Sequence, residues 1–218
     1  MRSSAYKLQR LAVVLALIGM AGASQATVTV FTSKAAFDAA AAALTTATDT
    51  FEDLDTVDLV TGPLTRDLGN GLSYTADSDS HEFFNGTTAT SGIYLSNNSN
   101  LDTITFNGFS AGVMGLSGNF FAVNASGAFN SRALTLTATD GSGTITQSFT
   151  PATAAGTFLG FLSDGPLTSV TLKITTTGQR WASADNIELA AAVPEPSGYA
   201  LMLAGLGAIA WVARRRKA

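Results

Sequence analysis

Short runs in which apolar and polar residues alternate recur through the second half of the chain, and they constrain its fold more than any other feature. A period of two places every second side chain on one face of a β-strand, so each run is typical of a strand with one buried face. The runs lie at residues 101–106, 132–139, 144–149, 167–177 and 185–190. The inward faces that the last four runs predict are formed by Leu134, Leu136, Ala138, Ile145, Phe149, Val170, Leu172, Ile174, Ile187 and Leu189.

Turn-forming residues separate these runs. The sequence Asp140-Gly141-Ser142-Gly143 is a strong hairpin signal, and it predicts a β-hairpin over residues 132–149. Glycine, proline and asparagine mark further turns at residues 62–63, 69–71, 97–98 and 165–166. About ten closely spaced strands without helices between them predict a mainly β fold, an antiparallel β-sandwich with a jelly-roll-like topology.

One short helix is predicted near the start of this fold. Residues 28–31 are typical of a short strand. Thr32 or Ser33 can cap a helix through its hydroxyl group, and the alanine-rich run to about Leu44 supports that helix. Phe37 and Leu44 are seven residues apart, so they are predicted to share its buried face.

Residues 1–26 have the three parts of a secretory signal peptide. Arg2, Lys7 and Arg10 precede an apolar stretch of 13 residues at 11–23, and Ser24 and Ala26 supply the small residues of a cleavage site. The apolar stretch is shorter than the roughly 17–25 residues of a membrane span. The order of the basic, apolar and cleavage regions favours a cleaved leader over a buried helix. We therefore place the predicted β-sandwich domain at residues 27–192.

The charge of the chain between its two ends is strongly acidic. Residues 27–193 include five basic and fifteen acidic residues, a net charge of −10. No basic patch is present to neutralise phosphates, so nucleic-acid binding is disfavoured. An acidic surface favours solubility and can collect hard cations such as calcium. The chain has no cysteine, which excludes thiol catalysis and cysteine-bound metals.

Residues 193–218 have a different character from the rest of the chain. Pro194, Glu195 and Pro196 come first, and an uncharged, mostly apolar stretch follows that predicts a short transmembrane helix at about residues 198–213. The stretch ends in a basic tail, which consists of Arg214, Arg215, Arg216 and Lys217. Because basic clusters stay on the cytoplasmic side, the preceding part of the chain is predicted to lie outside. On span and charge alone, a plain anchor after a proline linker is the simpler interpretation.

The order of motif, short span and basic tail closely resembles the PEP-CTERM sorting signal of Gram-negative bacteria. The resemblance covers only this terminal segment, with Pro194, Glu195 and Pro196 as the sorting motif and residues 214–217 as the basic stop. It implies processing by an exosortase, a transpeptidase-like membrane enzyme of species that export polysaccharide. The protein is then expected to be anchored transiently in the inner membrane and released to the cell surface or the extracellular space.

Shorter pieces of the chain resemble other β-sandwich proteins. Residues 31–40, 50–54, 156–174 and 183–190 are similar, more weakly, to a β-sandwich type common among proteins with this tail. Residues 51–53 and 184–189 also look like parts of carbohydrate-binding jelly rolls in which a glutamate and an aspartate share a structural calcium. This resemblance implies Glu52 and Asp185 as calcium ligands, and calcium takes six to eight oxygen ligands. Alternatively, Asp185 and Asn186 only turn the chain into its last strand, and Glu52 is solvated.

Two further places are candidates for binding or chemistry. Trp181, the only tryptophan between residues 27 and 193, can present its ring to a sugar, although packing over the sandwich edge is the commoner role. His81, the single histidine of the chain, lies in a segment with Asp77, Asp79 and Glu82. One histidine without cysteine makes a poor zinc site, and no nucleophile motif accompanies it, so an acidic surface loop is favoured.

The sequence therefore predicts a secreted, exosortase-sorted β-sandwich protein of the cell surface or extracellular matrix, associated with exopolysaccharide and without enzymatic activity. The expected partners are the exosortase, the inner membrane as a transient anchor, and exopolysaccharide, but not nucleic acid. The alternative is a carbohydrate-binding module with a structural calcium site. An extracellular hydrolase is a third hypothesis, which is disfavoured because no catalytic set is recognisable.

Overall fold

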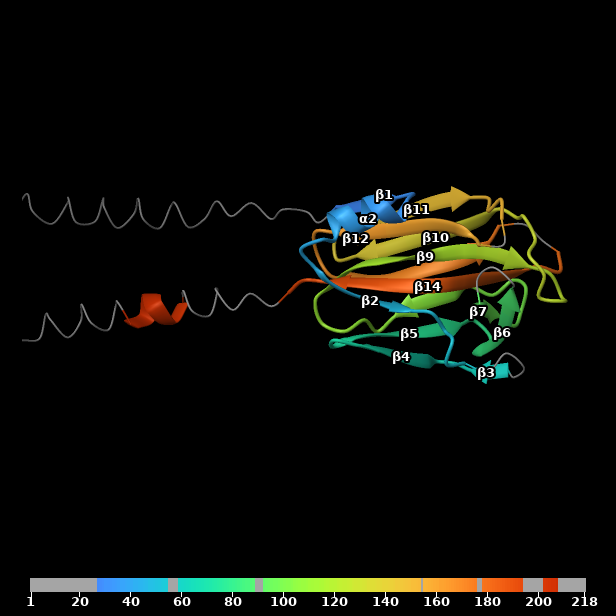
Figure 1. Ribbon diagram of the computed structural model, residues 1–218, viewed down its shortest axis with the longest axis horizontal. Coiled ribbons are helices and arrows are strands. Elements are labelled where there is room, and N and C mark those ends of the chain that lie inside the picture. Colours follow the sequence, from blue (N-terminus) through green and yellow to red (C-terminus); the bar gives the residue numbers. More distant parts are fainter. Residues whose placement is uncertain are drawn as a thin grey trace, which may run out of the picture.

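The computed structural model describes residues 27–54, 59–88, 92–153, 155–175, 178–193 and 202–207, in which two antiparallel sheets pack face to face (Figure 1). Sheet A contains β1 (Val28–Phe31), β2 (Thr45–Asp49), β3 (Leu59–Thr61), β6 (Glu82–Thr88), β7 (Gly92–Asn97), β9 (Val113–Val123), β12 (Thr157–Ser163) and β14 (Trp181–Ala191). Sheet B contains β4 (Leu64–Gly69), β5 (Leu72–Ser78), β8 (Ile104–Asn107), β10 (Leu134–Asp140), β11 (Thr144–Phe149) and β13 (Leu167–Ile174). The described fold is the antiparallel β-sandwich that the alternating runs predict.

The strands are ordered so that the chain crosses repeatedly between the two sheets. The order is β1-β12-β9-β14-β7-β6-β3 in sheet A, with β2 also paired to β14, and β11-β10-β13-β8-β5-β4 in sheet B. Such crossing between two packed antiparallel sheets is also a feature of jelly rolls. The predicted inward-facing residues all belong to the core between the sheets or pack against it. Each large apolar side chain that is fully buried there stabilises the fold by about 1.5–3 kcal/mol.

The predicted hairpin over residues 132–149 is confirmed, with β10 and β11 paired in antiparallel register along their length. At its turn, the Asp140 N–H donates to the carbonyl oxygen of Gly143 at 3.0 Å. The Asp140 carboxylate accepts the N–H of Gly143 at 2.9 Å and the hydroxyl of Ser163, on β12, at 2.6 Å. The bond from Ser163 first, and then those from the N–H groups of Ser142 and Gly143, lower the pKa of Asp140, and the Ser163 bond ties the turn to sheet A.

Helix α2 (Lys34–Ala40) lies at one end of the sandwich beside β1 and β12 (Figure 1). The hydroxyl of Ser33 caps it by accepting the N–H of Ala36 at 3.3 Å. Phe37 is fully buried, as predicted. The helix ends at Ala40 rather than near Leu44, because the chain must turn back there for β2 to pair with β14. Leu44 packs against the same cluster as Phe37, but from outside the helix.

The last strand is longer than the sequence predicts. β14 begins at Trp181, and its first residues pair with β9 from Trp181 to Asp185. Asp185 therefore lies inside the strand, and the interpretation of Asp185 as a turn residue before it is wrong. The register shifts between Asp185 and Glu188, and Asn186 has a φ of 52°, so a β-bulge interrupts the strand at this point.

Several predicted terminal features lie outside the described residues. These are the signal peptide at 1–26, the sorting motif of Pro194, Glu195 and Pro196, and the basic tail at 214–217. Of the predicted transmembrane helix at about 198–213, only residues 202–207 are described, and they are helical. Among the residues that the structure describes, no helix has the length and apolar character that crossing a membrane requires.

Candidate functional site

Asp185, one of the two predicted calcium ligands, lies where one edge of β14 changes its partner strand. On this edge, residues 183–184 of β14 pair with β7, whereas residues 187–191 pair with β2. Asp185 lies between the two pairings. The loop after β2 brings Glu52 to the start of β7, where its Oε1 accepts the N–H of Ile93 at 2.9 Å. The Glu52 carboxylate occupies the space beside Gly92, where an added Cβ would clash with it.

Asp185 is a buried carboxyl group with only part of its hydrogen-bonding capacity used. It is completely buried on β14. Its Oδ1 accepts the N–H of Asn186 at 2.7 Å, whereas its Oδ2 has no hydrogen-bond partner among the described residues. Burial raises the pKa of Asp185 to about 7, and the negative charges of Glu52 and Asp49 add to this effect against the opposing bond from Asn186. The carboxyl group therefore changes its charge near neutral pH.

The pair suits calcium in ligand type and only partly in ligand number. Glu52 and Asp185 provide hard carboxylate oxygens, and the unbonded Oδ2 of Asp185 is available to a cation. In the described part of the chain, however, no three histidine, cysteine, aspartate or glutamate residues are grouped to hold a metal ion. The remaining ligands would have to be backbone carbonyls or water. The structure places Glu52 where its charge acts on Asp185, and calcium binding stays a prediction.

A partly buried ion-pair network holds the loop that carries Glu52. Arg66, on β4, bonds to Asp49 through Nε at 2.7 Å and through Nη2 at 2.8 Å, and to Asp53 through Nη2 at 2.6 Å. The Tyr74 hydroxyl donates to Asp49 at 2.7 Å, and the Arg66 guanidinium lies 5.6 Å from the centre of the Phe51 ring. Asp49 and Arg66 are seventeen residues apart and belong to different sheets, so no local sequence pattern reveals their contact.

A pocket of about 210 Å³ lies near the other end of β14, where Trp181 is located. The residues that line it come from β6, β7, β9, β14 and the two segments that follow β7 and β9. They include Phe84, Ser96, Asn98, Val123, Asn124 and Trp181. Trp181 is partly buried against a small cluster that is separate from the main core. Its Nε1–H donates to the carbonyl oxygen of Asn98 at 2.8 Å. Both predicted roles of Trp181, packing and presenting a ring, are therefore compatible with its position.

The segment after β9 forms a fixed wall of this pocket. Asn124 Oδ1 accepts the N–H groups of Ser126 and Ala128, each at 3.0 Å. The buried Tyr94 hydroxyl donates to the carbonyl oxygen of Gly127 at 2.9 Å. Burial raises the pKa of Tyr94 to about 12, so its hydroxyl remains a donor at physiological pH. Nothing in the local sequence predicts this wall, because Tyr94 is distant from it along the chain.

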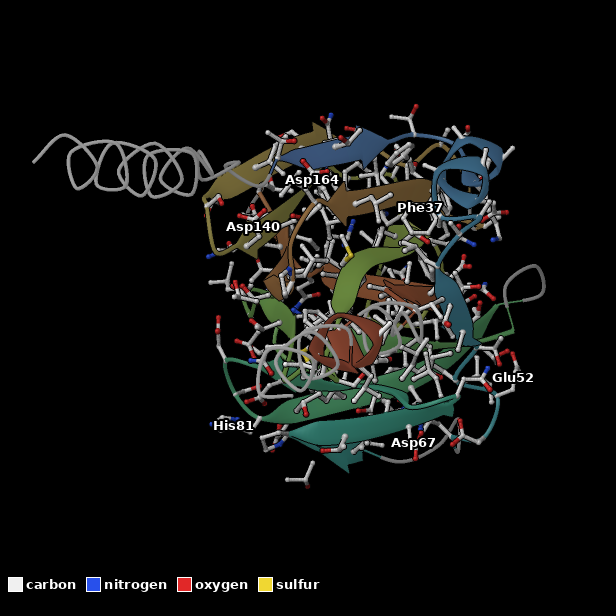
Figure 2. All side chains as sticks on the ribbon, turned by 90° about the vertical axis from the view of Figure 1, so that its left-hand side faces the viewer. Phe37, Glu52, Asp67, His81, Asp140 and Asp164 are labelled. Atoms are coloured by element: carbon white, nitrogen blue, oxygen red, sulfur yellow. The ribbon has the colours of Figure 1, made fainter. Side chains whose placement is uncertain are left out.

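The segment around His81 is distant from the Glu52 site, and Figure 2 shows His81 and Glu52 on opposite sides of the sandwich. His81 is exposed, and its Nδ1 lies 2.8 Å from Oδ1 of Asp77, which raises the pKa of His81. Asp79 accepts the N–H of Thr103 and Glu82 accepts from Asn98, so these carboxylates bond to different partners. Among the described residues, no hydroxyl group bonds to the other ring nitrogen of His81.

Comparison with known proteins identifies the C-terminal segment. Residues 192–217 match the PEP-CTERM protein-sorting motif. Comparison with curated proteins finds no match. The motif implies an exported protein that an exosortase recognises and that passes through a transient membrane-anchored state. The chain therefore carries a PEP-CTERM sorting signal, which begins at the residue after β14.

Proposed function

We propose that this exported protein acts outside the cell as a non-enzymatic surface or matrix protein associated with exopolysaccharide. The observation that carries the proposal is the position of the sorting signal, which begins directly after the last strand of the sandwich. Sorting of this tail delivers the whole sandwich to the outside. The acidic charge of residues 27–193 suits a soluble extracellular protein.

The arrangement of polar groups supports a role in binding or structure rather than catalysis. The Arg66 network uses its carboxylates to join β2, β4 and the following loop. Asp77 pairs with His81 on an exposed loop, and Asp140 closes a hairpin turn. Each of these groups stabilises local structure, and none of them lines the pocket beside Trp181.

A carbohydrate-binding module with a structural calcium is the second candidate function. The observation that favours it is the Trp181 pocket, in which aromatic and amide side chains lie together. Glycan binding by this pocket would hold the protein at the cell surface, because a matrix protein must contact the exopolysaccharide with which it is associated. The calcium part of this candidate depends on Glu52 and Asp185.

Fractionation of the producing bacterium tests the main proposal. We expect the wild-type chain in the extracellular polysaccharide fraction, and we expect Glu195→Ala, which changes the sorting motif, to remain in the membrane fraction. Asp38→Asn, which removes one exposed carboxylate from α2, is the matched control and should fractionate as the wild type does. If enzymatic removal of the polysaccharide leaves the distribution of the wild-type chain unchanged, the proposed association with exopolysaccharide is wrong.

A further inference from the structure

We propose that the Trp181 pocket binds one uncharged sugar residue of a glycan, an inference that rests on the proposed extracellular function and specifies its ligand. The pocket is lined by two aromatic rings, Phe84 and Trp181, together with amide and hydroxyl side chains. Its chemistry, its volume and its rigid wall each restrict the class of ligand.

The lining of the pocket favours a neutral ligand. No aspartate, glutamate, lysine or arginine is among the described residues that line it. A carboxylate or sulfate entering the pocket would lose water without gaining a cationic partner, which is costly. A sugar residue without a charged group avoids this cost. The pocket therefore discriminates against uronic acids.

Two amide side chains of the pocket each keep one end without a hydrogen-bond partner among the described residues. Asn124 Oδ1 is occupied by backbone N–H groups, so its orientation is fixed and its Nδ2 remains a donor. Asn98 Nδ2 donates to a Glu82 carboxylate oxygen at 2.9 Å, which leaves its Oδ1 as an acceptor. A ligand that carries hydroxyl groups can satisfy both, since a hydroxyl group donates and accepts. A purely apolar ligand would satisfy neither.

The aromatic side chains supply the apolar part of the site. The Nε1–H of Trp181 is already bonded to the carbonyl oxygen of Asn98, so the ring offers its apolar surface rather than its donor. Phe84 is only partly buried. A sugar ring has C–H groups on its faces and hydroxyl groups at its rim, and it matches a site with apolar surfaces and polar ends.

The volume of the pocket limits the ligand to one ring. Pockets for drug-sized ligands measure about 300–1,000 Å³, whereas this pocket measures about 210 Å³. The wall formed by residues 124–128 is held by the Asn124 bonds and by Tyr94, so it is ordered before a ligand arrives. A preformed wall reduces the entropy cost of binding. We therefore infer recognition of a single residue, at a chain end or a branch, rather than of an extended strand.

The test is ligand-observed saturation-transfer NMR with the full chain in mild detergent. The probes are the methyl glycosides of glucose, galactose, mannose and N-acetylglucosamine, and those of glucuronic and galacturonic acid. We expect at least one neutral glycoside to bind with a Kd about tenfold or more below that of the two acids. If none of the neutral glycosides binds, or if the acids bind equally well, the inference is overturned.

Two variants place the binding in this pocket. Trp181→Ala should abolish the NMR signal of the bound glycoside. Asn124→Asp keeps an oxygen that accepts the loop N–H groups but removes the Nδ2 donor and adds a negative charge, so we expect Kd to rise about tenfold or more. Asn107→Asp makes the same chemical change on β8 of sheet B and should leave Kd unchanged. Wild-type affinity in Asn124→Asp would overturn the inference, even if Trp181→Ala fails to fold.

The outcome separates this inference from the proposed function. If the wild type and Asn124→Asp fractionate equally with exopolysaccharide and neither binds a glycoside, the proposed function stands and the pocket is not its site. If the glycoside binds in the pocket but the chain does not fractionate with polysaccharide, the inference stands and the proposed function fails.

Discussion

The carboxyl group of Asp185 is completely buried, and only one of its two oxygens accepts a hydrogen bond from the described residues. A buried charge without a partner is costly, so such a group either keeps its proton or attracts a cation. The nearby charge of Glu52 strengthens both tendencies. These two states of Asp185 lead to two predictions, one without and one with calcium.

Without calcium, stability should fall as pH rises because of Asp185. The pKa of Asp185 is raised from 3.8 in the unfolded chain to about 7 in the folded chain. The folded state therefore binds the extra proton between these values, and its stabilising effect, full below pH 3.8, is lost as pH rises through 7. At about 1.4 kcal/mol per pKa unit, the loss is of the order of 4 kcal/mol.

Urea unfolding of the full chain between pH 4 and 8, in the presence of a chelator, measures this effect. Asp185→Asn should be nearly free of the pH-dependent loss and should be more stable than the wild type at pH 8. The control Asp38→Asn changes an exposed carboxylate, and its free energy of unfolding should depend on pH as that of the wild type does. If the free energy of unfolding depends on pH equally in the wild type and in Asp185→Asn, the raised pKa of Asp185 is contradicted.

With calcium, the same residue should become a ligand. Binding to the folded state alone stabilises it by about 2.7 kcal/mol at a hundredfold excess of calcium over Kd. The Tm of the wild type should therefore rise with calcium and fall again with a chelator, whereas Asp185→Ala should not respond. An identical Tm of the wild type with and without chelator would exclude a calcium site at Glu52 and Asp185.

At the scale of the strands, Arg66 joins elements of both sheets. Its side chain is 13% exposed and that of Asp49 is 4% exposed, so their ion pair is shielded from solvent. Removal of one partner from a buried pair leaves an uncompensated charge and typically costs about 3–5 kcal/mol. Because Asp49 ends β2 and Asp53 lies in the next loop, the same change should also loosen the segment that carries Glu52.

We therefore predict that Arg66→Met lowers the free energy of unfolding by about 3 kcal/mol. Arg132→Met, which replaces an exposed arginine, is the matched control and should change it by less than about 0.5 kcal/mol. Denaturant unfolding followed by circular dichroism measures both. A loss in Arg66→Met no larger than that in the control would show that the network contributes little.

The sequence predicts well those elements that are determined by residues close together along the chain. The hairpin of β10 and β11 follows from two alternating runs and the glycine-rich turn at 140–143, and the inward faces of β10 and β13 follow from the period of two. The sequence does not predict the start of β14, because the small residues at 182–184 carry little hydrophobic signal. It does not predict the Arg66 network or the pocket wall either, since their partners are brought together only by the folded sheets.

At the scale of the whole molecule, the sandwich and the tail are separate in sequence. The strands extend from Val28 to Ala191, and the sorting signal occupies residues 192–217. Glu52 and Asp185 could be paired from the sequence only through a resemblance, because their distance along the chain gives no physical reason for contact. The tail is recognisable without a fold, since its motif, apolar stretch and basic residues are contiguous in the sequence.

The intact mass of the protein released by its bacterium tests the central claim, that the chain is exported and sorted through its tail. We predict a mass that lacks residues 1–26 and the hydrophobic segment after Pro196. Mass spectrometry of the culture medium, with the Glu195→Ala variant beside the wild type, measures this directly. A released wild-type protein whose mass still includes residues 197–218 would contradict exosortase processing and leave a plain membrane anchor as the explanation of the tail.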